Sequence, residues 1–148
     1  YDEAAQDLTI HAVRDEATWQ YLLAHTDGTE TECENWLIQD AGGQIVGYMR
    51  LPEHHFGEEL VVSEVSRLGF EAALMALQHL KTLVVERDKP GIRFNLPANC
   101  TLMQLARSLD GHDLGTYAWQ IHVPDVAALL HALTPVLERR VAGHRSPD

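Results

Sequence analysis

The residue types between Pro52 and Glu59 are those that bind divalent metals and basic groups. This stretch holds two histidines and three glutamates within eight residues. His55 and Glu59 are four residues apart, which would place two ligands on one face of a helix. However, Pro52 and Gly57 disfavour a helix here, and no further ligand pair stands out elsewhere in the sequence. We therefore interpret the stretch as a solvated acidic loop with no metal, which would face an amine substrate if the domain is catalytic.

The balance of charges limits the classes of partner. The chain of 148 residues has a formal net charge of −11, so it would repel the phosphates of nucleic acid. An acidic surface fits a basic substrate such as an amine, and it fits equally a charge that serves solubility alone. No apolar run approaches the ~20 residues of a membrane helix, so we expect no membrane contact.

Two further observations bear on the compartment. The first seven residues are acidic and lack the apolar core of a signal peptide. Cys33 and Cys100 do not have the spacing of metal ligands, which is typical of unpaired thiols in a reducing environment. We therefore expect a cytoplasmic protein.

The N-terminal half of the chain predicts a helix followed by a hairpin. Asp15 is a good N-cap, and Trp19 and Leu22 follow at helical spacing, which predicts a helix over 15–25. Alternating strands are predicted over 35–40 and 44–51, joined by a glycine-containing turn. A β-branched run then predicts a further strand, the central one, over 60–65.

The C-terminal half alternates helices and strands. Strong helix formers with apolar residues at core-facing spacing predict a helix over 70–86. The other predicted elements are a strand over 92–96, a helix over 102–109 capped by Asn99 or Thr101, a strand over 115–123, and a last helix from 126 to about 141 that contains Pro135 as a kink or a break. This order predicts an α/β (α+β) fold with a mixed, largely antiparallel sheet, flanking helices and a C-terminal helix.

The order of the elements, with these loops, resembles the GNAT (GCN5-related) N-acetyltransferase fold. The resemblance implies transfer of acetyl from acetyl-CoA to an amine. In that family, backbone N–H groups of the turn after the central strand, together with a helix N-terminus, hold the pyrophosphate of the cofactor. The resemblance assigns this role to Val65, Arg67, Leu68, Gly69 and Phe70.

A second GNAT pattern follows the next strand and assigns a cofactor contact to Asn99. The tyrosine that often protonates the CoA thiolate is Ala106 in this chain, and Glu71 places negative charge where a phosphate would approach. Both departures indicate an eroded cofactor signature. Glu64 could act as general base and Tyr117 as the replacement acid, although each residue type is more often structural at such a position.

More specifically, three stretches resemble a degenerate GNAT-like domain. Residues 13–23, 91–97 and 117–125 are similar to the second domain of enhanced-intracellular-survival-type multidomain acetyltransferases, which lacks a working cofactor site. The resemblance implies a GNAT-like domain over 1–125, without the first strand and helix usual in that family. It also implies a connecting helix and tail over 126–148.

Two functions remain open. The chain is either an acetyltransferase domain acting on an amine, or a non-catalytic GNAT-like module that scaffolds or oligomerises with an active acetyltransferase domain. The expected partners are accordingly an amine substrate, a second copy of the chain, or neighbouring domains of a longer chain. No sequence motif of serine hydrolases, zinc proteases or nucleotide-binding proteins occurs.

Overall fold

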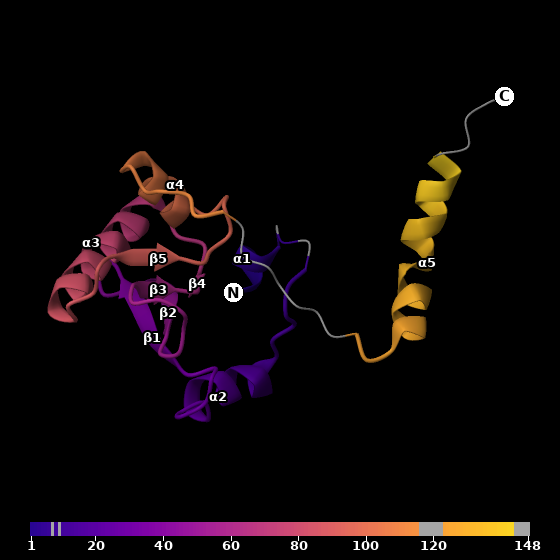
Figure 1. Ribbon diagram of the computed structural model, residues 1–148, viewed down its shortest axis with the longest axis horizontal. Helices are drawn as coiled ribbons and strands as arrows, with labels where there is room; N and C mark the ends of the chain where they lie inside the picture. The colour runs from indigo at the N-terminus through magenta and orange to yellow at the C-terminus, as the bar shows by residue number, and fades with distance from the viewer. Residues whose placement is uncertain (7, 9, 116–122, 144–148) are drawn as a thin grey trace. The chain divides into compact units, whose positions relative to one another are not determined.

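The structure, a computed structural model, describes residues 1–6, 8, 10–115 and 123–143. The chain separates into two units, residues 1–115 and 116–148. The described elements are, in chain order, α1 (Asp2–Ala5), α2 (Glu16–Ala24), β1 (Cys33–Gln39), β2 (Ile45–Pro52), β3 (Leu60–Val62), β4 (Glu64–Val65), α3 (Phe70–Glu86), β5 (Ile92–Phe94), α4 (Thr101–Ser108) and α5 (Val126–Gly143) (Figure 1). This confirms the mixed α+β class and the C-terminal helix.

The hairpin of β1 and β2 confirms the clearest prediction from the sequence. The two strands pair antiparallel from Cys33 opposite Pro52 to Gln39 opposite Ile45. In the turn, Gly43 adopts φ 78° and donates its N–H to the Asp40 carbonyl at 2.9 Å. Glycine is favoured there because it reaches positive φ without a steric penalty.

The strand predicted over 60–65 is divided in two, which corrects the prediction of one continuous central strand. β3 pairs in parallel with β5, whereas β4 pairs antiparallel with β2. Ser63 lies between them and donates its N–H to the Arg50 carbonyl at 3.1 Å. The run is uniformly β-forming, so its composition does not reveal that its two halves have different partners.

The core of the first unit lies between α3 and one face of the strands. Side chains alternate along a strand, so Trp36 and Ile38 lie on the same face as Met49 of β2. Leu80 of α3 is fully buried against this face, and Leu102 of α4 is 1% exposed. The opposite face of β2 carries Tyr48 and Arg50 in place of apolar side chains.

The helices follow the predicted spans closely, with one correction. α3 begins and ends as predicted, and Asp15 caps α2 by accepting the Thr18 N–H at 2.8 Å. The predicted capping of α4 by Asn99 or Thr101 is wrong. Its N-cap is Cys100, without a side-chain hydrogen bond, because the Thr101 hydroxyl donates instead to the Leu68 carbonyl at 2.8 Å.

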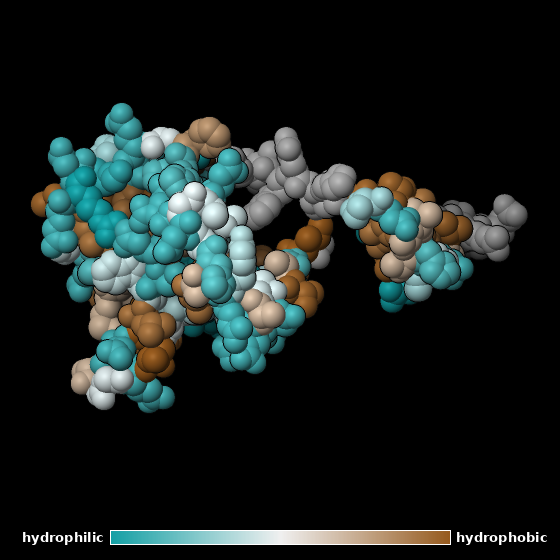
Figure 2. Space-filling view, turned by 90° about the horizontal axis from the view of Figure 1, so that it is seen from below, coloured by the Kyte–Doolittle hydropathy of each residue, from teal (hydrophilic) through white to brown (hydrophobic). Residues whose placement is uncertain are grey.

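The described part of the second unit is the helix α5. The Asp125 carboxylate accepts the Ala128 N–H at 2.8 Å at its start, and Pro135 lies inside the helix without ending it. Large apolar side chains are exposed along it: Val126, Leu129, Leu130, Leu133, Val136, Leu137 and Val141 (Figure 2). Most of the strand predicted over 115–123 lies outside the described residues. No described helix is both long and apolar enough to cross a membrane.

Candidate functional site

The parallel pairing of β3 with β5 ends before the turn over 66–69 that the sequence singles out. The last bond between the two segments joins the Asn95 N–H to the Val62 carbonyl at 2.9 Å. From Ser63 onward the chain pairs with β2 instead, so the two segments no longer share hydrogen bonds. The turn over 66–69 then leads directly into α3.

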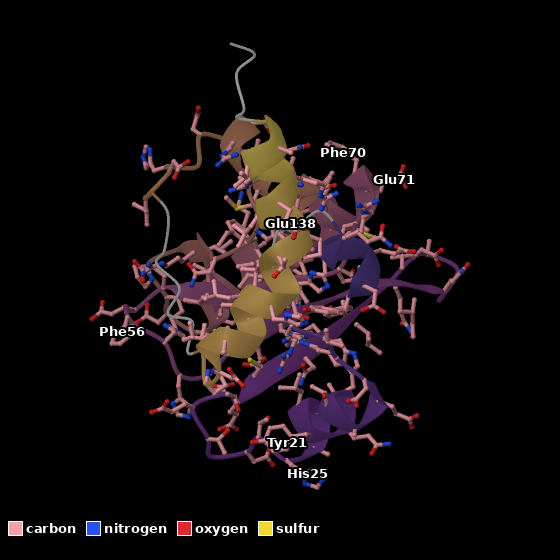
Figure 3. The ribbon with its side chains drawn as sticks, turned by 90° about the vertical axis from the view of Figure 1, so that its right-hand side faces the viewer. Tyr21, His25, Phe56, Phe70, Glu71 and Glu138 are labelled. Atoms are coloured by element: carbon pink, nitrogen blue, oxygen red, sulfur yellow. The ribbon has the colours of Figure 1, made fainter. Side chains whose placement is uncertain are left out.

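The turn presents the N-terminus of α3 without a side-chain cap. Gly69 is the N-cap residue in extended conformation, and a Cβ added there would meet no atom within 4 Å. Helix N-termini carry free N–H groups and partial positive charge, which favour anions. Phe70 and Glu71 lie in the first turn of α3 and are exposed (Figure 3). Glu71 therefore adds negative charge beside the surface that an anion would approach.

The structure divides the residues assigned to the cofactor into two groups. Val65 and Leu68 are buried in the core, at 7% and 5% exposure, so they position the turn from below. The exposed residues are Arg67, Gly69, Phe70 and Asn99. The bond from the Thr101 hydroxyl to the Leu68 carbonyl ties the segment that contains Asn99 to the turn, so these assigned residues come from two neighbouring segments.

Glu64, the candidate base, has both carboxylate oxygens engaged. Arg14 donates to Oε1 at 2.8 Å and to Oε2 at 2.7 Å, and the Tyr48 hydroxyl donates to Oε1 at 2.7 Å. Arg50 Nη1 lies 3.9 Å from Oε2. Both oxygens of Glu64 thus accept short hydrogen bonds from neighbouring donors, two of them from a charged guanidinium.

Two aromatic rings lie against the Arg14 guanidinium. Its central carbon lies 4.1 Å from the Tyr1 ring centroid and 4.9 Å from the Trp19 ring. Trp19 also meets the Tyr48 ring edge-on at 5.9 Å between centroids. Cation–π contacts of this kind favour a planar guanidinium held against a carboxylate. Arg14 thereby attaches the segment before α2 to the polar face of the sheet.

Arg50 is the buried cation of the cluster. Its exposure is 5%, and its Nε donates to Asn35 Oδ1 at 2.8 Å. Its Nη2 is buried and has no acceptor among the described residues. Arg14, Arg50 and Glu64 together carry one more positive than negative charge, in a chain whose net charge is −11. The cluster is therefore locally cationic.

Burial and the carboxylate shift the ionisation of its neighbours. Burial, followed by the hydrogen bond to Glu64 and its charge, raises the pKa of the Tyr48 phenol far above its ordinary value. Burial alone would lower the pKa of Arg14, but the hydrogen bond and charge of Glu64 raise it overall. Tyr48 is thus a protonated donor at neutral pH, and Arg14 a permanent cation.

No known family model matches the chain, and comparison with curated proteins and with solved structures finds no match either. The site must therefore be judged by its own geometry.

The other predicted site residues lie apart from this cluster or outside the described part. Tyr117 belongs to the residues that the structure does not describe. Ala106 is on α4, and its carbonyl accepts the N–H of Gly111 at 2.9 Å. In the acidic loop, His54 Nε2 lies 3.6 Å from a Glu32 carboxylate oxygen. Among the described residues, no three histidine, cysteine or carboxylate side chains gather in a way that could hold a metal ion.

Arg14, Tyr48 and Arg50 were missed by reasoning from the sequence. One signal was present, since Tyr48 and Arg50 alternate with the buried Met49 and Leu51 along β2. An arginine within such a strand indicates a buried partner. Nothing in the sequence pairs Arg14 with Glu64, because fifty positions separate them.

Proposed function

We propose that the chain is a GNAT-like domain that binds acetyl-CoA at the turn over 66–69 and belongs to a cytoplasmic N-acetyltransferase acting on a primary amine. The observation that carries this proposal is the N-terminus of α3 without a side-chain cap, reached by a turn that follows the end of the parallel pairing of β3 with β5. The free N–H groups at such a helix N-terminus can receive the phosphates of a cofactor.

In the proposed reaction the neutral amine attacks the thioester carbonyl of acetyl-CoA. A C–N bond forms, the C–S bond breaks, the nitrogen loses one proton to become the amide, and the CoA thiolate takes one up. Glu64 would remove the proton from the ammonium form of the substrate. Arg14 donates to both carboxylate oxygens, so the substrate ammonium would compete with Arg14 for Glu64. The acid remains a prediction at Tyr117.

A non-catalytic GNAT-like module is the second candidate, and three observations favour it. Glu64 is held by Arg14 and Tyr48, Glu71 is exposed at the first turn of α3, and Ala106 has no proton to give. In this case the chain would scaffold or oligomerise with an active acetyltransferase domain.

Calorimetric titration with acetyl-CoA separates the two candidates. We expect heat of binding at ligand concentrations up to about 1 mM, and its loss in Gly69→Glu, which adds bulk and negative charge at the N-cap. Gly91→Glu is the matched control, since a Cβ there also meets no atom within 4 Å. Binding that Gly69→Glu leaves intact would contradict the assigned turn, and no binding at all would leave the non-catalytic module.

Where binding is found, mass spectrometry of a panel of primary amines tests catalysis. The expected result is an increase of one acetyl group on an amine, dependent on acetyl-CoA and reduced at least tenfold in Glu64→Gln. Binding without acetyl transfer to any amine would contradict the catalytic proposal.

A further inference from the structure

β1 forms the outer edge of its sheet. The strand order is β1-β2-β4, and no strand among the described residues pairs with the other side of β1. In β2 the carbonyls of Tyr48 and Arg50 accept N–H groups from the β4 side. Residues in an antiparallel strand alternate in the direction of their backbone groups, so Trp36 bonds to β2, while Asn35 and Leu37 direct their N–H and C=O groups outward.

This edge lacks the features that usually prevent strands from pairing. β1 contains neither lysine nor proline, and its irregularity lies at its far end, between Ile38 and Gln39. Its only charged residue, Glu34, is bound by both terminal nitrogens of Arg87 and by Trp36 Nε1. The charge of Glu34 is therefore compensated by Arg87, although the chain carries a net charge of −11.

Apolar surface continues from the edge onto α3. Leu37 is 64% exposed on one face of β1, and Met75 of α3 is 40% exposed. A shallow pocket of about 260 Å³ lies between β1 and α3, where its lining includes Trp36 and Ile38 of β1 and Met75 and His79 of α3. An added strand would thus satisfy the outward backbone groups and cover apolar side chains at the same time.

We propose that β1 is a dimerisation edge, which pairs antiparallel with β1 of a second copy across a two-fold axis at Trp36. In this register Asn35 of each copy lies opposite Leu37 of the other, and the two pairs exchange four backbone hydrogen bonds. Glu34 lies opposite Ile38 of the second copy. A shift of two residues would instead place Glu34 opposite Asp40, and like charges in that position are destabilising.

The second copy is favoured as occupant because one contact satisfies two identical edges. It joins two three-stranded sheets into one of six strands, with the Trp36 side chains facing each other across the axis. The two pockets, each lined by Trp36, then adjoin at the new contact. This inference does not depend on acetyl-CoA binding, and it extends the function to a specific mode of self-association.

Sedimentation equilibrium of the full chain over a concentration series tests the proposal. We expect a concentration-dependent dimer. Leu37→Pro removes an outward N–H from each copy without removing a bond between β1 and β2. It should raise the dimer dissociation constant at least tenfold, since about 1 kcal/mol is lost per hydrogen bond and the proline ring obstructs the edge.

A second pair of variants covers the case in which Leu37→Pro fails to fold. Leu37→Lys places a charge on the edge, and Val85→Lys makes the same change at an 80% exposed position on α3. We expect the first to weaken the dimer and the second to leave it unchanged. Amide exchange measured by NMR should slow at Asn35 and Leu37 as concentration rises.

Three outcomes would overturn the proposal. The first is a monomer at every concentration up to about 1 mM. The second is a dimer in which the amides of Asn35 and Leu37 exchange as fast as in the monomer, which would locate the interface elsewhere. The third is equal weakening by Leu37→Lys and Val85→Lys, which would show that net charge and not the edge determines association.

Discussion

The contact between Arg14 and Glu64 provides the sharpest test of the site geometry. Arg14→Gln removes the guanidinium that donates to both oxygens of Glu64 and contacts the Tyr1 and Trp19 rings. The side chains of Arg14 and Glu64 are only 14% and 17% exposed. Breaking a fully buried ion pair costs about 3–5 kcal/mol. Here Arg50 and the Tyr48 hydroxyl still face Glu64 after the substitution, so we expect a loss of about 2–3 kcal/mol.

A double-mutant cycle separates this contact from other effects of the substitutions. The free energy of unfolding would be measured in urea for the unmodified chain, Arg14→Gln, Glu64→Gln and the double variant. We expect each single change to lower the melting temperature by roughly 5–10 °C for a chain of this size. The double variant should lose about 2 kcal/mol less than the sum of the single losses. Arg14→Lys should fall between the unmodified chain and Arg14→Gln, since lysine keeps the charge but not the bidentate geometry.

Single losses that add within about 0.5 kcal/mol would contradict a direct contact, because additivity is the behaviour of residues that do not interact. An Arg14→Lys variant as stable as the unmodified chain would contradict the bidentate geometry. The result also bears on the proposed mechanism, since a strongly coupled pair means that a substrate amine would compete with Arg14 for Glu64.

Two further predictions concern the turn and the acidic loop. Gly47→Ala would bring a Cβ into collision with the buried Leu68 side chain, so we expect it to destabilise the chain by about 1–3 kcal/mol in thermal unfolding. Gly91→Ala is the control and should not destabilise the chain, because a Cβ at Gly91 meets no atom within 4 Å. The pKa of Glu53 is raised, first by desolvation and then by a hydrogen bond and the charge of a neighbouring carboxylate on β1. A carboxyl group whose pKa is raised by folding contributes stability at low pH, and this stability is lost as the pH rises above about 4.5. At pH 7 the Glu53→Gln variant should therefore unfold at a higher temperature than the unmodified chain. Near pH 4 the two should unfold at the same temperature. The gain should stay below about 1 kcal/mol because the side chain is exposed, and it would be contradicted if Glu58→Gln, the same charge change in the same loop, stabilised the chain equally.

Local patterns predicted the elements that depend on local interactions. α3 was placed correctly because its apolar residues recur at helical spacing from its start to its end, and the hairpin because a glycine turn separates two alternating strands. The capping of α4 was mistaken for a non-local reason, since the Thr101 hydroxyl bonds to Leu68, thirty-three positions earlier. The division of the strand over 60–65 has the same origin, because it depends on which strand each half meets.

The candidate site was predictable only in part. The position of Glu64 at the strand end and of Gly69 at the helix start followed from the sequence. The partners of Glu64 did not, because side chains from β2 and from the segment before α2 meet it only after folding. The sequence thus located a carboxylate but gave no sign that its charge is compensated by arginine.

The position of Pro135 has a consequence for the form of α5. Successive residues of a helix are rotated by about 100°, so the large apolar side chains from Val126 to Val141 fall within an arc of about 140°. Pro135 lies almost diametrically opposite the middle of that arc. A proline removes one backbone hydrogen bond and its ring pushes the preceding turn away, which opens a helix on the proline side. We therefore expect α5 to curve with its apolar face on the concave side of the bend.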